Sequence, residues 1–411
     1  MKKISRYILV FITILTSAVA LPKLYWLAFE KPIRAPFVMY SCINHDFMIQ
    51  RHNNGLIRLD NKGNQYTRDE FELKLPLLFV RQLLISGTMP DTINGIAMDV
   101  HDISQARSTF RFRPKTMIAP DPGLYPLFES ESGRANLEMP RDYFRITRRM
   151  EFVNAKDNKV DEKKSQMFTA VLQKRGFNFP AKIIAGIPTT RKSCDEGYLV
   201  IDKKDQLFHI KMIETRPYVK KVELPDKIKF KHIECVDFKN KKYYSYLFST
   251  DNEIYILTQD EYKLIKFPVT GFIAEKEELR IYGNLFYYTV ISTAVDHIKV
   301  TVLDNEYNKI DEYNETWPKR SERTEGKVFS YIFPAQINMA DKNSSFINFY
   351  FEKTKGYNWL FLNFLLMIIQ FGIIREEGLK PRKNLIDFAV VAVTGIFGFL
   401  SVNFFQNKFF D

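Results

Sequence analysis

Residues 198–211 read YLVIDKKDQLFHIK, and this stretch decides the class of the fold. It holds two runs of apolar, aromatic and β-branched residues, Tyr198–Ile201 and Leu207–Ile210, on either side of a polar segment. Short runs of this kind around a polar turn are typical of two antiparallel strands. The stretch therefore predicts a β-hairpin.

The hairpin pattern returns along the chain, with a third strand in each full copy and a shorter piece at the end. The predicted strands are Tyr198–Asp202, Leu207–Lys211 and Tyr218–Pro225; Tyr246–Asp251, Ile254–Leu257 and Tyr262–Pro268; Phe286–Val290, His297–Val302 and Lys309–Tyr313; and Phe329–Phe333 with Phe346–Phe351. A period of roughly 40 to 48 residues lies in the range of β-propeller blades. A β-sandwich has similar strand spacing, so both architectures stay open.

Helices are predicted among the strands that precede these repeats. Thr67 and Glu70 have the spacing of a capping box at the start of a helix. Pro76 interrupts the helical pattern that follows, and Gly87 is placed to end it. A second helix is predicted from Glu162 to Arg175.

Three apolar segments lie at the ends of the chain: Tyr7–Phe29, Trp359–Ile374 and Leu385–Phe405. A helix that crosses a membrane needs roughly 20 mostly apolar residues, so the segments predict three transmembrane helices. Ala18-Val19-Ala20 resembles a signal-peptidase site. Apolar residues resume at 24–29, which favours an uncleaved anchor, but cleavage stays open.

We therefore expect a mainly β outer domain, propeller-like or a β-sandwich, with a few helices and three transmembrane α-helices. The predicted parts are an N-terminal membrane anchor (1–29), a mixed α/β first half (30–190), a β-repeat second half (191–356) and a C-terminal transmembrane hairpin (357–411).

Basic residues predict the orientation of these segments. Lys2, Lys3 and Arg6 precede the first segment, and the loop Arg375–Asn384 holds four Lys and Arg residues. Such residues stay in the cytoplasm, so we expect a bacterial inner-membrane protein with a cytoplasmic N-terminus, a periplasmic domain and Asp411 outside. The formal net charge is +12, of which residues 1–29 carry +4 and residues 357–411 carry +1, which leaves +7 on the outer domain. A positive excess outside the membrane suits an anionic headgroup or glycan surface, but a generally Lys-rich surface is the favoured interpretation. The topology argues against nucleic acid as a partner.

Sequence motifs for catalysis are absent. The chain has no Gly-x-Gly, no Walker lysine loop, no Gly-x-Ser-x-Gly and no His-Glu-x-x-His. His45, Asp46 and His52 come closest to a metal or acid–base cluster, but their spacing fixes no ligand geometry, and a solvated loop is the favoured interpretation. The three cysteines are too few for a disulfide framework. We expect no enzyme, no cofactor and no metal.

Two arginine-bearing strands are candidates for anion binding. Strand alternation puts Arg111 and Arg113 on one face, and Arg145 and Arg149 on one face. If the two strands were neighbours, four guanidinium groups would share a face suited to phosphate or carboxylate. The favoured alternative is a solvated strand whose arginines discourage aggregation.

A row of small residues in the last apolar segment is a candidate for membrane docking. Its members are Ala389, Ala392, Gly395, Gly398 and Ser401. Small residues allow close approach of membrane helices. The row predicts either docking of another membrane protein on Ala392, Gly395, Gly398 and Ser401, or packing inside the hairpin.

Several strings resemble an uncharacterised Bacteroidetes-type family of membrane-anchored proteins, a domain of unknown function. They are Arg58–Tyr66, Val80–Leu83 with Met89–Gly95, Asp195–Tyr198 and Arg216–Asp226. The resemblance implies a companion of ABC-type transporters and supplies no catalytic residues. We expect an envelope protein that acts by binding to the lipid bilayer and a membrane-protein partner, as an accessory of a transporter or envelope assembly. The alternatives are an extracytoplasmic ligand sensor and an enzyme on envelope glycan or lipid.

Overall fold

The computed structural model describes residues 2–410 except Asn53, Asn54, Arg134, Ser193, Asp226 and Leu379. The chain forms two compact units. The β unit consists of Ala35–Ala294 and Ile298–Glu315, and the apolar-helix unit of Met1–Arg34, Val295–His297 and Thr316–Asp411. Residues 316–356 thus belong to the same unit as the apolar helices. The predicted division of the chain into four parts stays a prediction.

The hairpin that decides the fold class is confirmed. It forms β10 (Tyr198–Ile201) and β11 (Leu207–Ile213), which pair antiparallel with Val200 opposite Phe208. The Asp202 carboxylate closes the turn by accepting hydrogen bonds from the backbone N–H groups of Lys204 and Gln206, 2.8 and 2.9 Å away. A side chain that bonds the backbone two residues on is a usual means of closing a turn.

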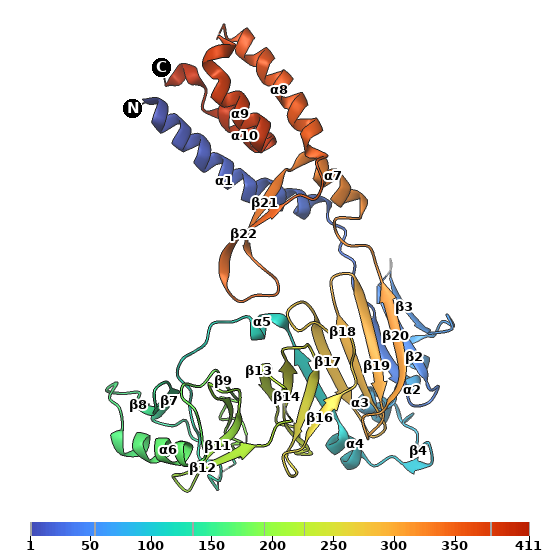
Figure 1. Ribbon diagram of the computed structural model, residues 1–411. Coiled ribbons are helices and arrows are strands. Elements are labelled where there is room, and N and C mark those ends of the chain that lie inside the picture. Colours follow the sequence, from blue (N-terminus) through green and yellow to red (C-terminus); the bar gives the residue numbers. More distant parts are fainter. Residues whose placement is uncertain are drawn as a thin grey trace. The chain divides into compact units, whose positions relative to one another are not determined.

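Three antiparallel sheets follow one another along the chain (Figure 1). They are β9 (Ile183–Gly186), β10, β11 and β12 (Arg216–Val222); β13 (Phe230–Cys235), β14 (Tyr243–Ser249), β15 (Ile254–Thr258) and β16 (Leu264–Phe267); and β17 (Glu278–Gly283), β18 (Tyr288–Thr293), β19 (His297–Leu303) and β20 (Lys309–Thr316), with β6 (Ser108–Phe112) added beside β17. Each sheet has one more strand, at its start, than the pattern predicted. The mainly β fold is confirmed, but the sheets of the described residues close no barrel or propeller.

The middle sheet, β13 to β16, is covered on both faces. On one face, Phe248 packs against Phe112 of β6 with ring centroids 4.4 Å apart. On the other face, Leu247 belongs to the same buried cluster as Leu199 of β10. Burial on both faces explains why β14 and β15 are apolar almost throughout instead of alternating. Each fully buried side chain of this size contributes about 1.5–3 kcal/mol.

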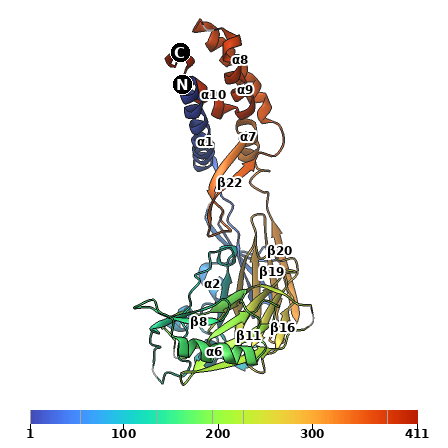
Figure 2. The same ribbon diagram turned by 60° about the vertical axis from the view of Figure 1, so that its left-hand side comes forward.

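The other elements of the β unit surround these sheets. They are β1 (Phe37–Ser41), β2 (Asp46–His52), β3 (Leu56–Asp60), α2 (Arg68–Lys74), α3 (Val80–Ser86), β4 (Thr92–Ile93), β5 (Ile96–Ala97), α4 (Val100–Ala106), α5 (Pro114–Met117), β7 (Asp142–Ile146), β8 (Met150–Asn154) and α6 (Glu162–Lys174). The Thr67–Glu70 capping box and the left-handed Gly87 after α3 are both confirmed. So is the second helix, α6, which packs against β8 and β12 (Figure 2).

The apolar-helix unit contains short elements besides its apolar helices. They are α1 (Lys2–Phe29), α7 (Thr324–Ile332), β21 (Ala335–Ala340), β22 (Ile347–Lys353), α8 (Trp359–Glu376), α9 (Leu385–Thr394) and α10 (Ile396–Phe404), with single 3-10 turns at Pro381–Asn384 and Asn407–Phe409. The predicted strand Phe329–Phe333 is wrong, because most of it lies in α7. Four-residue spacing places Phe329 and Phe333 on one side of the chain, where both are buried beside Ala18.

The third predicted transmembrane helix is also wrong. By length and composition, α1 from Ile4 and α8 are long and apolar enough to cross a membrane, and an apolar helix near the N-terminus has the features of a signal anchor as well as those of a membrane span. The segment Leu385–Phe405 instead breaks at Gly395, whose φ of 58° and ψ of −128° end α9 and begin α10. At 1.5 Å per residue, each piece is only about 15 Å long, half of what a bilayer core requires.

The two short helices turn back on each other at Gly395. Asp387 in the first turn of α9 and Phe405 at the end of α10 both bond the Arg6 side chain of α1. Asn407 donates to the Asp387 carboxylate at 3.3 Å and also bonds Asn384. The hairpin α9–α10 therefore starts and ends at the same level of the unit. Asp411, expected on the outer side, lies outside the described residues.

Candidate functional site

The two arginine-bearing strands are not neighbours. Arg111 lies on β6, whose partner is β17, whereas Arg145 lies on β7, whose partner is β8. On β6, alternation is as predicted, with Phe110 and Phe112 buried and Arg111 exposed, and Arg113 follows the strand. The prediction of one strand through Arg145 and Arg149 is wrong, because Arg149 lies in the turn between β7 and β8. The expectation that all four arginines share one sheet face is wrong, because the pairing of β6 is long-range and the pairing of β7 is a local hairpin.

Each arginine pair converges on a glutamate of its own sheet. Arg111 forms two hydrogen bonds with Glu278 at 2.8 and 2.9 Å, and Arg113 lies 3.6 Å from the same carboxylate. Arg145 and Arg149 bond Glu151 at 2.8 and 3.0 Å. Hydrogen bonding by Arg145 holds the pKa of Glu151 below its usual value. Anion binding at these arginines stays a prediction, and any anion there has to compete with these carboxylates.

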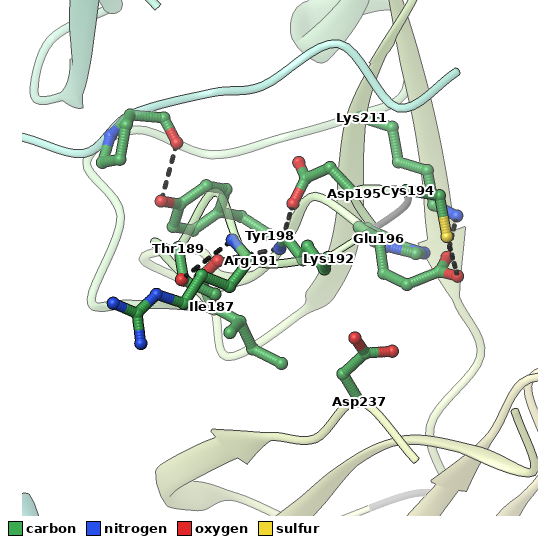
Figure 3. A network of polar contacts seen from close by, with 12 residues as sticks. Ile187, Thr189, Arg191, Lys192, Cys194, Asp195, Glu196, Tyr198, Lys211 and Asp237 are labelled. Atoms are coloured by element: carbon green, nitrogen blue, oxygen red, sulfur yellow. Dashed lines mark hydrogen bonds and ion pairs between the residues drawn. The ribbon is translucent and has the colours of Figure 1, made fainter. Parts of the chain in front are cut away.

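A buried polar network surrounds the loop between β9 and β10 (Figure 3). Lys192 donates to the Asp195 carboxylate at 2.5 Å and to the carbonyl of Ile187 at 2.8 Å, and the two charged side chains are 5% and 1% exposed. Burial raises the pKa of Asp195, while Lys192 opposes that shift. Gly197 follows at a φ of +70°, where a β-carbon would lie 2.1 Å from the carbonyl oxygen of Ile210. The network therefore fastens this loop tightly onto β11.

The neighbouring charged group is the pair of Glu196 and Lys211, 2.5 Å apart. The backbone oxygen of Glu196 faces Nε2 of His209, and Nδ1 lies 2.8 Å from the Tyr262 hydroxyl. A carbonyl only accepts, so Nε2 carries the proton and Nδ1 accepts from the tyrosine. Burial lowers the pKa of His209 to about 3, so the imidazole is neutral at ordinary pH.

The chemistry open to this network is limited by its packing. A small cavity lies beside the network and is lined by Lys192, Cys194, Glu196, His209 and Cys235. The centre of a water molecule can occupy about 10 Å³ of it, so the cavity has room for about one water. Burial raises the pKa of the Cys235 thiol to about 12, so it is not a thiolate nucleophile. Both imidazole nitrogens of His209 are occupied. We interpret the network as a clamp on the loop. Its only signal in the sequence was the string Asp195–Tyr198.

Metal ligands are not clustered in the described part of the chain, where no three His, Cys, Asp or Glu side chains are grouped to hold an ion. Of the residues considered for such a site, His45 lies in a turn at a φ of 50°, with Nδ1 3.2 Å from the Tyr287 hydroxyl. Asp46 bonds the backbone of the next residue, and His52 ends β2.

The second candidate site is a buried ion pair in the apolar-helix unit, which sequence analysis missed. Arg6 and Asp387 are hydrogen-bonded at two points, Nη1 to Oδ1 and Nη2 to Oδ2, each at 2.9 Å. Their side chains are 1% and 4% exposed. Nε of Arg6 donates to the carbonyl of Phe405 at 2.6 Å, which satisfies a helix-end carbonyl. The pair joins the first apolar helix to both ends of the last hairpin.

The small-residue row lies against this chain's own helices. A β-carbon on Gly395 would lie 2.2 Å from Oδ1 of Asn363 in α8, and one on Gly398 would lie 2.2 Å from the Thr394 hydroxyl. Ser401 is fully buried and bonds the carbonyl of Phe397, and the carbonyl of Ala392 accepts from Asn363 at 2.9 Å. These contacts are those of internal packing; docking on the row stays a prediction.

Comparisons with known proteins give a family but no activity. The family model described as "Domain of unknown function (DUF4857)" matches residues 37–303. No curated protein matches the sequence. Among solved structures, PorZ, a surface component of the type-IX secretion system of Porphyromonas gingivalis, is similar with 9% identity and a TM-score of 0.23 over 71% of this chain and 33% of that one. Dihydro-heme d1 dehydrogenase NirN has 9% identity and a TM-score of 0.22 over 58% and 66%. The chain thus spans about a third of the PorZ chain.

Proposed function

The chain belongs to the DUF4857 family of domains of unknown function, and from that premise, which assigns no activity, we propose that it is a membrane-anchored envelope protein that acts by binding. The β unit is the binding part, held at the membrane by the apolar-helix unit as an accessory of a transporter or other envelope assembly. The observation that carries the proposal is the ion pair of Arg6 and Asp387.

The ion pair supports a permanent anchor over a cleaved signal peptide. Removal of residues 1–20 would take away the cation of Asp387 together with the part of α1 that packs on α10. Loss of one partner from an intact buried pair already costs about 3–5 kcal/mol. Charged side chains inside membrane segments are rare and are paired with one another when present. A segment discarded after export has no need of a bidentate partner in the last hairpin.

The exposed faces of the long helices support contact with lipid. Ile4, Ile8 and Phe11 on α1 are 68%, 54% and 60% exposed, at helical spacing. Phe361 and Phe364 on α8 are 73% and 65% exposed. Large apolar faces of this kind are stable in hydrocarbon and mark a membrane or partner contact when they occur on a soluble surface.

The proposed topology follows from these helices and the basic residues. α1 crosses outward from a cytoplasmic N-terminus, the β unit lies outside, and α8 returns to a cytoplasmic loop at residues 377–384. The hairpin α9–α10 then enters the membrane about halfway and turns back at Gly395. This topology differs from a three-span arrangement because it leaves the C-terminus inside.

The mature N-terminus tests the anchor. The full chain is expressed in bacterial cells, the membranes are washed with alkaline carbonate, and the mass of the retained protein is measured. The proposal predicts a membrane-retained chain that still includes Arg6. A mature chain that begins after Ala20, or a protein released by carbonate, contradicts it. Cross-linking in the same membranes, followed by mild detergent, tests the binding role, for which a stoichiometric membrane-protein partner is expected.

A further inference from the structure

The two-stranded sheet β21–β22 has an apolar face that is largely open. Ile347, Phe349 and Phe351 alternate along β22 and are 81%, 77% and 71% exposed. Phe351 pairs with Ile337 of β21, and cross-strand partners share a face of a sheet. Ile337 is partly buried against α1 and α7. One end of the apolar face is therefore covered by helices and the other end is open.

A groove continues this face onto α1. Its volume is about 620 Å³, within the range of pockets that hold small ligands. Val19 and Leu27 of α1 line one side, and Ile337 and Met339 of β21 line the other. The apolar floor of the groove thus runs on toward Phe351.

Cationic groups lie along the same groove. Arg320 is 3.0 Å from Glu30, and its guanidinium lies 3.6 Å above the Trp26 ring. Lys23, also in the lining, forms no hydrogen bond or ion pair with the described residues. Within the lining, Lys23 and Arg320 face the single carboxylate of Glu30, which gives the lining residues a net positive charge. Glu352, which bonds Gln336 of the lining, also acts on Arg320. Positive groups near a membrane attract anionic headgroups, at about 1 kcal/mol each.

We infer that this groove seats one phospholipid with an anionic headgroup. Its phosphate lies at Lys23 and Arg320, and an acyl chain runs over Ile337 and Met339 toward the open side chains of β22. A lipid is favoured over a protein because the groove lies at the end of a candidate span. In addition, β22 ends at Lys353 and α8 begins at Trp359, and the chain between them spans at most about 20 Å. The open end of β22 is therefore close to the start of the second candidate span. The inference rests on the proposed anchoring in a membrane.

Lipid retention by the full chain tests the charged part of the groove. The protein is purified in mild detergent, loaded with equal amounts of phosphatidylglycerol and phosphatidylcholine, and weighed with its bound lipids by native mass spectrometry. The wild type is expected to retain phosphatidylglycerol in preference. Lys23→Gln should reduce that preference about fivefold, the equivalent of one cation near a headgroup. Lys31→Gln, a nearby exposed lysine outside the lining, should leave it unchanged.

The apolar part is tested in the same way. Phe349→Ser with Phe351→Ser should lower retention of both lipids, whereas Ile310→Ser on β20 should not. Equal retention of the two lipids by the wild type, or equal retention by Lys23→Gln and Lys31→Gln, overturns the lipid site. So does a protein partner that is lost from the β22 variant while lipid retention stays the same. Release of the wild type by carbonate instead contradicts the anchoring itself, so the two failures are distinguishable.

Discussion

Arg6 and Asp387, 381 positions apart, meet in a buried bidentate ion pair with both N–O distances at 2.9 Å. The same guanidinium bonds the end of α10 through Phe405. The first apolar helix is therefore tied to both ends of the last hairpin. The ion pair exists only while α1 remains part of the chain.

Removing one partner of the pair should destabilise the apolar-helix unit strongly. We expect Arg6→Gln or Asp387→Asn to lower its stability by about 3–5 kcal/mol, and the double change Arg6→Met with Asp387→Leu to lower it less than either alone. All three tryptophans lie in this unit, so tryptophan fluorescence in detergent reports its unfolding. Arg375→Gln, an exposed arginine of α8, is the control. A double variant Arg6→Gln with Asp387→Asn whose loss of stability equals the sum of the two single losses would contradict the pairing.

Side chains on the glycines of the hairpin should loosen it from within. Gly395→Leu combines a positive φ with a clash against Asn363, and Gly398→Leu clashes with Thr394 and Val390. Both variants should unfold at lower temperature and expose residues 385–404 to protease, while the β unit keeps its tyrosine signal. Gly372→Leu is the matched control, because no atom lies within 4 Å of its added β-carbon. A normal melting temperature for Gly395→Leu would show that the turn is not built as described.

The three thiols should differ in reactivity. Burial raises the pKa of Cys42 to about 11 and that of Cys235 to about 12, so both hold almost no thiolate at pH 8. Cys194 and Cys235 are both partly exposed, and Cys194 lies in the loop clamped by Lys192 and Asp195. Alkylation of the folded protein at pH 8, followed by peptide mass spectrometry, should modify Cys194 first. Equal rates at Cys194 and Cys235 would contradict the raised pKa of the Cys235 thiol.

Acid should loosen the β unit through His209. Its folded pKa is about 3 against an ordinary value of 6.5, so between these values the unfolded state binds the extra proton. Stability is therefore full above pH 6.5 and falls toward pH 3, by about 1.4 kcal/mol per pH unit. Hydrogen exchange of β11, corrected for the intrinsic pH dependence, should show less protection at pH 5 than at pH 7.5. His209→Gln should flatten this dependence, and His101→Gln, an exposed control, should not.

Local features of the fold were predictable from the sequence. The hairpin at residues 198–211 and the Thr67–Glu70 cap depend on neighbours in the chain, and both are present. The extra strand β17 was missed because it alternates between buried and half-buried positions between two strong patterns. Its partner β6 comes from about 170 positions earlier, a pairing that carries no local signal.

The candidate sites were harder to predict for the same reason. Arg6 has the appearance of an ordinary basic residue before an apolar segment, and Asp387 of a charge near a span end. Only the turn at Gly395 brings Asp387 and Phe405 together beside Arg6. That turn is hidden in the sequence, because a row of small residues is equally compatible with a continuous membrane helix.

We propose that α1 and α8 cross the membrane while the last hairpin turns back inside it. Single cysteines at Met139, Lys380 or Phe410, in a background whose three native cysteines are replaced by alanine, are labelled with an impermeant maleimide in intact and permeabilised cells. We expect Met139→Cys to be labelled in intact cells, and Lys380→Cys and Phe410→Cys to be labelled only after permeabilisation. Labelling of Phe410→Cys together with Met139→Cys in intact cells would contradict it, because the last segment would then cross the membrane.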